Sequence, residues 1–136
     1  MTAGYSSTPL AKKLGIKDGS HLVTVNAPGY FAELLRPLPA GVTISSDVTR
    51  EADIIHLFTN SRDELFRRLF ELRGLIKLNG CIWVSWYKKA AKLATEITED
   101  TVREAAFPLG LVDVKVCAVD EKWSGLKLVI RRENRV

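Results

Sequence analysis

The side chains in this sequence that could bind or react with another molecule gather in three short loops, each of which follows an apolar, strand-like run. These loops offer amide, hydroxyl, aromatic and ammonium groups: Asn26, Gly29, Tyr30, Asn60, Ser61, Trp86, Lys88 and Lys89. Lys88 and Lys89 could neutralise a phosphate or a carboxylate, and backbone N–H groups at a helix start near Ser61 could assist them. The set could therefore hold an anionic or aromatic small molecule.

Each of these residues also has a purely structural interpretation. Paired lysines after a strand are often solvated. The Ser61 hydroxyl can cap its own helix, because Ser61 and Glu64 have the spacing of a capping box. Trp86 can belong to the hydrophobic core as readily as to a pocket. Residue types alone leave both interpretations open.

The sequence identifies no catalytic residue and no metal site. His21 opens one strand-like run and His56 lies inside another, and neither has an identifiable serine or cysteine partner or a metal-like spacing. Cys81 and Cys117 lie far apart within apolar runs, so we expect buried, reduced thiols.

Hydrophobic periodicity and turn residues predict the elements that position the three loops. Strands are expected at 21–25, 42–45, 53–59 and 81–86, with a turn at Asn79-Gly80 before the last of these and a hairpin at 112–118 and 126–130. Helices are expected at 10–14, around 30–35, from Ser61 through Ile76, and from Thr98 to Pro108. The near-continuous apolar character of 53–59 suits a strand covered on both faces, which favours parallel pairing.

This order of elements predicts a three-layer α/β fold with an open mixed sheet, mostly parallel, that ends in an antiparallel hairpin. We expect a single domain over 1–136, with a short helix and turn over 1–20, β/α units over 21–110, the hairpin over 111–132 and a tail over 133–136. In open α/β sheets, ligands gather outside the carboxyl ends of the parallel strands, near the point where the strand order reverses. The three loops are therefore expected at one edge of the sheet.

The order of elements resembles a shortened Rossmann-type fold of the class I methyltransferases, whose parallel β/α units also end in a helix and an antiparallel hairpin. This resemblance implies that the turn with Asn26 and Gly29 would approach S-adenosylmethionine. Asp47, roughly twenty residues further on, would stand where such enzymes bind the cofactor's ribose hydroxyls. The turn has one glycine instead of three, and the segment before Asp53 has no room for the further helix and strand of a full methyltransferase.

Three segments, at 8–17, 86–89 and 108–129, resemble a bacterial family known only as a domain of unknown function. The resemblance spans nearly the whole chain and is most specific in the C-terminal half. It implies the same fold and a bacterial cytoplasmic setting, and it implies no activity. Tyr87 and Lys92 stand where the family would have proline and glycine, so the loop that contains them could differ in shape here.

The charge and hydropathy of the chain limit the classes of partner that it could bind. The formal net charge of +4 is too small and too dispersed to indicate nucleic-acid binding. The densest basic stretch, Arg131, Arg132 and Arg135, is expected to be a solvated tail. No apolar run approaches the length of a membrane span, and the first residues contain none long enough for a signal peptide. We therefore expect a cytoplasmic protein with no membrane partner.

Three hypotheses of function remain. The leading one is a non-catalytic domain that binds a small molecule, such as an anion, or a protein partner, and that uses no cofactor. The second is a reduced S-adenosylmethionine-dependent methyltransferase that binds its cofactor near Asn26, Gly29 and Asp47. The third is a protein-interaction module, for example a homodimer, in which exposed apolar surface and Trp123 pack against another chain.

Overall fold

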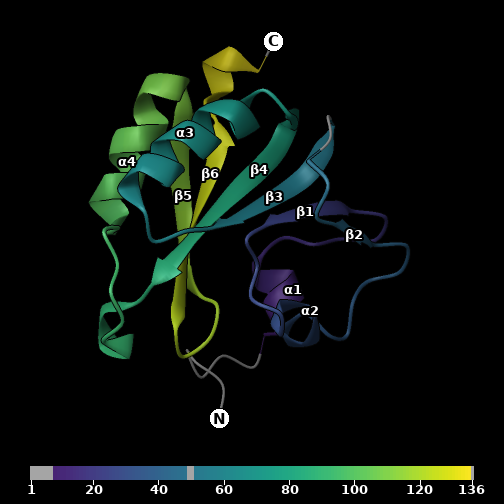
Figure 1. Ribbon diagram of the computed structural model, residues 1–136. Coiled ribbons are helices and arrows are strands. Elements are labelled where there is room, and N and C mark those ends of the chain that lie inside the picture. The colour runs from purple at the N-terminus through teal and green to yellow at the C-terminus, as the bar shows by residue number, and fades with distance from the viewer. Residues whose placement is uncertain (1–7, 49–50, 136) are drawn as a thin grey trace.

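The computed structural model describes residues 8–48 and 51–135, and its elements follow the expected order (Figure 1). The strands are β1 His21–Val25, β2 Thr43–Ser45, β3 Ala52–Phe58, β4 Ile76–Tyr87, β5 Leu111–Ala118 and β6 Trp123–Ile130. The α-helices are α1 Leu10–Lys13, α2 Phe31–Leu34, α3 Arg62–Arg73 and α4 Glu99–Ala106. Short 3-10 helices lie at η1 Lys89–Ala91, η2 Phe107–Leu109 and η3 Arg132–Asn134.

The strands form one sheet in the order β2-β1-β3-β4-β6-β5. β2, β1, β3 and β4 pair in parallel, whereas β6 pairs antiparallel with both β4 and β5. The predicted mixed, mostly parallel sheet with a C-terminal hairpin is therefore confirmed. Because β2 and β3 flank β1 on opposite sides, the strand order reverses at β1, and the crevice between β1 and β3 is the switch point of the sheet.

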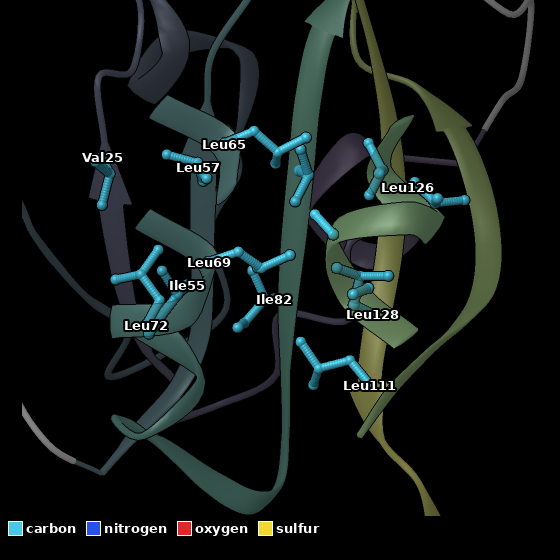
Figure 2. Close-up of a cluster of buried hydrophobic side chains, with 14 of the residues drawn as sticks. Val25, Ile55, Leu57, Leu65, Leu69, Leu72, Ile82, Leu111, Leu126 and Leu128 are labelled. Carbon is cyan, nitrogen blue, oxygen red and sulfur yellow. The ribbon is translucent and has the colours of Figure 1, made fainter. Parts of the chain in front are cut away.

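Helices cover both faces of the sheet, which gives the expected three layers (Figure 1). Figure 2 shows the core beneath α3 and α4, where Leu65 and Leu69 of α3 pack with Ile55 and Leu57 of β3 and with Ile82 of β4. All five side chains are fully buried. Burial of a leucine or isoleucine of this kind contributes about 1.5–3 kcal/mol, so this face alone accounts for much of the stability of the fold.

A second core lies on the opposite face, beneath α1 and α2. Leu14 of α1, Phe31 of α2 and Trp83 of β4 belong to it, together with Ile54 and Phe58 of β3. Since side chains alternate along a strand, Ile54 and its neighbour Ile55 enter different cores. β3 is thus covered on both faces, as its apolar sequence predicts.

The two longest helices begin at the caps that the sequence predicts. Ser61 Oγ accepts a hydrogen bond of 3.2 Å from the N–H of Glu64 at the start of α3. Thr98 and Thr101 form a reciprocal capping box at the start of α4. Each cap gives a partner to an N–H group that the helix itself leaves unbonded, which typically contributes about 1 kcal/mol.

β4 differs from the expectation, because it begins at Ile76 and not at Cys81. The predictions that Ile76 ends the third helix and that Asn79-Gly80 turns the chain are wrong. Ala52 pairs with Ile76 and Ile54 pairs with Cys81, so the four residues 77–80 bulge opposite one residue of β3. Asparagine and glycine are favoured in hairpin turns and tolerated in bulges, and the local pattern does not separate the two.

The C-terminal elements are also more ordered than the sequence indicates. β6 begins at Trp123, earlier than expected, because the Asp120 carboxylate accepts hydrogen bonds of 2.8 and 2.9 Å from the N–H groups of Lys122 and Trp123 and tightens the turn. The tail is exposed over 132–135, as expected, and it also folds back, since Arg135 Nε donates to the carbonyl of Ile130 at 2.7 Å.

β5 forms the outer edge of the sheet next to β6. Asp113 pairs with Leu128 and Lys115 pairs with Lys127, so Val114 is a one-residue bulge. Val114 and Val116 are both about half exposed, at 55% and 52%.

The bulge in β4 predicts that Gly80→Ala destabilises the protein. A Cβ at residue 80 would lie 2.8 Å from the carbonyl oxygen of Asp53 and 3.2 Å from that of Ala52, which are backbone atoms that cannot rotate away. We expect a loss of about 1–3 kcal/mol, measured by urea unfolding. Gly74→Ala is the matched control, because a Cβ there meets only the carbonyl oxygen of Glu71, at 3.9 Å. A Gly80→Ala variant as stable as the control would contradict the bulge.

Candidate functional site

Polar contacts bridge the crevice at the switch point. Asn26, which follows β1, adopts a left-handed backbone conformation with a φ of 61°, and its Nδ2 donates to Glu64 Oε2 at 3.3 Å. The hydroxyl of Thr59, which follows β3, donates to the other carboxylate oxygen at 2.5 Å. Glu64 on α3 therefore joins the turn after β1 to the end of β3.

Asn60 and Ser61 hold neighbouring loops in place. Asn60 Oδ1 accepts a hydrogen bond from the N–H of Tyr87 at 2.8 Å, and the Asn60 carbonyl accepts one from the N–H of Glu96 at 2.9 Å. The Ser61 hydroxyl caps α3, as the structural interpretation predicts. The Glu96 carboxylate accepts a hydrogen bond of 2.8 Å from the N–H of Arg62, the first residue of α3. The start of α3, whose N–H groups were expected to help bind an anion, is therefore already bonded to an acidic side chain.

A pocket of about 530 Å³ lies beyond the end of β4, next to the start of α4. It brings together Trp86, Lys88 and Lys89 of the predicted site residues. Trp86 and Ile97 are 6% and 2% exposed and form an apolar wall, which Val116 of β5 extends. Trp86 thus contributes to the hydrophobic core and to the pocket at once.

The charge at this pocket is mainly positive. Neither Lys88 nor Lys89 forms an ion pair with any residue that the structure describes. Glu99 also lines the pocket, but its carboxylate lies 4.0 Å from the guanidinium of Arg103 and so faces a cation of its own. Two ammonium groups without counterions beside an apolar wall can attract an anion with a flat, apolar body.

The remaining predicted site residues lie apart from this pocket. The Tyr30 hydroxyl accepts a hydrogen bond from Trp123 Nε1 at 3.2 Å, and burial together with a hydrogen bond to Asp120 raises the pKa of Tyr30. Asp47, after β2, is exposed, and its carboxylate has no partner among residues 8–48 and 51–135. A Cβ on Gly29 would meet open space.

Trp123 does not form the docking surface that the third hypothesis expected. It is only 7% exposed, and its ring packs against Phe58 and Tyr87 with centroid distances of 5.1 and 4.5 Å. The expectation was wrong because the tight turn at Asp120 folds Trp123 inward, and a turn position in the sequence does not show this direction.

Sequence reasoning missed a buried polar pair. His56 Nε2 of β3 lies 2.7 Å from Ser85 Oγ of β4, and both residues are fully buried. The His56 ring stacks on Phe58 with a centroid distance of 4.2 Å and meets the edge of Phe31. His56 and Ser85 lie on different strands and come into contact only when β3 and β4 pair, so no sequence motif predicts their contact.

This pair is a structural feature of the core and not a nucleophile with its base, because burial excludes a substrate. His56 Nδ1 is buried and has no hydrogen-bond partner in the part of the chain that the structure describes. Burial lowers the pKa of His56 to about 3, since the charged imidazolium would have no solvent around it. His56 is therefore neutral at any physiological pH.

Burial likewise keeps the cysteines inert. Cys81 and Cys117 are free and buried, as expected, and desolvation raises the pKa of the Cys81 thiol to about 11. Across 8–48 and 51–135, no three histidine, cysteine, aspartate or glutamate side chains gather so as to hold a metal ion. No helix in these ranges combines the length and the apolar character needed to cross a membrane.

The strand order, the switch point and the closing hairpin define a Rossmann-like domain with a methyltransferase-like fold. Residues 41–132 match the family described as a protein of unknown function, DUF3052, and the chain belongs to that family. The expected membership of a family of unknown function is thus confirmed over residues 41–132. No curated protein matches the sequence.

Solved structures show the same fold at low sequence identity. A candidate type 11 methyltransferase from Sulfolobus solfataricus is 15% identical, with a TM-score of 0.65 over 92% of this chain and 91% of the other. An S-adenosylmethionine-dependent methyltransferase from Aquifex aeolicus is 14% identical, with a TM-score of 0.59 over 89% and 88%. The Aeropyrum pernix fibrillarin, which carries bound S-adenosylmethionine, is 12% identical, with a TM-score of 0.62 over 84% and 68%. Identities this low establish the shared fold alone.

The buried His56 predicts a pH dependence of stability. Its folded pKa of about 3 lies below its ordinary value of 6.5, so between these values the unfolded chain binds a proton that the folded chain does not. The free energy of unfolding should therefore fall as the pH drops below about 6.5, by up to about 1.4 kcal/mol per pH unit. Urea unfolding at pH 6.5 and pH 5 measures this slope.

The matched variant for this slope is His56→Phe/Ser85→Ala, which removes both partners and leaves no buried polar atom of the pair unbonded. It should lose most of the slope between pH 6.5 and 5, whereas His21→Gln should retain it. An unchanged slope in the double variant would show that His56 is not the group responsible.

Proposed function

We propose that this protein is a non-catalytic domain that binds a small organic anion in the pocket formed by Trp86, Lys88 and Lys89. The observation that carries the proposal is a pair of lysines at a pocket with an apolar wall, where neither lysine has a counterion within 8–48 and 51–135. A volume of about 530 Å³ falls within the range of ordinary ligand sites, roughly 300–1,000 Å³.

The chemistry of the wall narrows the ligand class. The largely buried Trp86 and Ile97 offer apolar surface, and the hydroxyl-bearing Thr95, Thr98 and Ser124 line the same space. A ligand with an aromatic or otherwise flat body and one acidic group would use both the wall and the lysines. Nucleotides and aromatic carboxylates meet this description.

Thermal unfolding with a panel of nucleotides, aromatic carboxylates and small inorganic anions tests this site. A ligand at about 100 times its dissociation constant should raise the free energy of unfolding by about 2.7 kcal/mol, a shift of several degrees for a domain of this size. The Lys88→Met/Lys89→Met variant should bind the active ligand about tenfold more weakly or worse, because it loses charge-assisted contacts.

Lys12→Met/Lys13→Met is the matched control, since it removes an adjacent lysine pair that does not line the pocket. This control should bind like the wild type. The proposal fails if no compound stabilises the protein, or if the Lys88/Lys89 double variant binds as tightly as the control.

A second candidate function is S-adenosylmethionine-dependent methyl transfer. The fold of the solved methyltransferases favours it, and so does the Asp47 carboxylate after β2, which has no partner among the residues that the structure describes. The crevice after β1 does not fit the cofactor as it stands. Glu64 occupies it, and its hydrogen bonds to Asn26 and Thr59 tie α3 to the turn after β1 where the cofactor would have to enter.

Excess S-adenosylmethionine or its demethylated product is therefore expected to leave the melting temperature unchanged. The measurement is the same thermal unfolding, with Asp47→Ala and Asp18→Ala compared at equal net charge. A stabilisation that Asp47→Ala abolishes and Asp18→Ala preserves would replace the anion-binding proposal with the methyltransferase one.

A further inference from the structure

A second pocket, of about 250 Å³, lies at the end of the sheet opposite the loops that follow the parallel strands. It is lined by the end of α1 and the turn after it, by Asp53 and Ile54 of β3, by residues 79–81 of β4, and by Lys127 of β6. Neither the sequence motifs nor the proposed ligand pocket uses these residues. Four elements far apart in the sequence therefore enclose an unassigned site.

The bulge in β4 shapes this pocket. Residues 77–80 stand opposite Asp53 alone, which moves Asn79 and Gly80 out of the regular ladder and into the pocket wall. The backbone of Gly80 packs too closely on β3 to accept a side chain. Bulges of this kind are frequent next to functional sites, where they redirect the chain.

Lys127 carries the charge of the site. It pairs with Trp83 across β4 and β6 and lies on the same face as α1, where it is partly buried. A Cβ on Gly15 would stand 3.6 Å from Lys127 Nζ, so the ammonium reaches the turn after α1. No carboxylate or other acceptor bonds to this ammonium among the described residues.

The acidic group of the pocket is already neutralised. Asp53 Oδ1 accepts from Lys77 Nζ at 2.8 Å and Asp53 Oδ2 accepts from the N–H of His21 at 2.7 Å, and these bonds lower the pKa of Asp53 against the opposing effect of desolvation. The Cys81 thiol is uncharged at neutral pH. Lys17 and Lys127 therefore give the pocket a positive charge that no acidic group in the described part of the chain compensates.

Hydrogen-bond donors accompany these charges. Ser20 is 8% exposed, and its Oγ accepts from the N–H of Lys17 at 2.9 Å, which leaves the hydroxyl hydrogen free to donate. Asn79, whose side-chain amide carries two further donors, also lines the pocket. Ammonium, hydroxyl and amide donors around a small polar space are the groups that a tetrahedral oxyanion requires.

We propose that this pocket binds a small oxyanion of the phosphate type, either free phosphate or the phosphate group of a small metabolite. The size supports this class, since about 250 Å³ is below the usual range for larger organic ligands. The site is distinct from the Trp86 pocket in place and in ligand, and it does not rest on the proposed function.

Titration with inorganic phosphate, followed by the amide resonances of Ser20, Gly80 and Cys81 in a ¹⁵N–¹H spectrum, tests the site. Potassium chloride at matched ionic strength is the reference. Saturable shifts confined to this end of the sheet are expected with phosphate. Lys127→Met, which keeps an unbranched side chain but removes the ammonium group, should raise the dissociation constant about tenfold or more.

Lys122→Met is the matched control, because it removes the same charge from an exposed position in the hairpin turn and should bind phosphate like the wild type. A second arm with glycerol 3-phosphate identifies the source of the anion. Tighter binding than phosphate would assign the site to a phosphorylated metabolite, and weaker binding would assign it to the free ion. Cooperative thermal unfolding confirms that each variant is folded.

The proposal is overturned if neither compound gives saturable shifts at Ser20, Gly80 and Cys81. It is also overturned if Lys127→Met binds phosphate as tightly as the wild type does. General salt effects of phosphate on a protein need no lysine, so only a specific site loses affinity in this variant.

Discussion

Burial of β3 on both of its faces is the constraint on which the rest of this structure depends. Ile55 and Leu57 need cover on one side, and Ile54 and Phe58 need it on the other. A strand of this kind is stable only inside a sheet with helices above and below it, and the parallel neighbours β1 and β4 follow from the crossovers that deliver those helices. Every loop that could bind a ligand takes its position from this arrangement.

The features that follow from local pattern were predictable. Apolar runs located the strands, and Ser61 and Thr98 marked the starts of α3 and α4. The closing hairpin and the shortened methyltransferase-like order were visible for the same reason. Each of these predictions depends on residues that are close together in the sequence, within one helical turn or one strand.

The features that depend on pairing between distant strands were not predictable. The bulge at Gly80 exists because β3 and β4 pair on both sides of it in registers that do not match. His56 and Ser85 meet only across those strands, and Trp123 turns inward to reach Tyr30 of a different layer. Of the predicted site residues, Trp86, Lys88 and Lys89 share one pocket because they are close together in the sequence. The positions of Asp47 and Tyr30 depend on the directions of their loops, which no short motif encodes.

The interrupted edge strand has a consequence for self-association. β5 presents half-exposed valines at the border of the sheet, and a regular strand of this composition would invite another chain to extend the ladder. The bulge at Val114 interrupts the regular spacing of backbone hydrogen-bonding groups in the middle of that strand, and Lys115 places a charge beside it. Because a bulge and a charge both weaken an edge strand as a template for another chain, this border of the sheet is less open to edge-to-edge pairing than a regular strand would be.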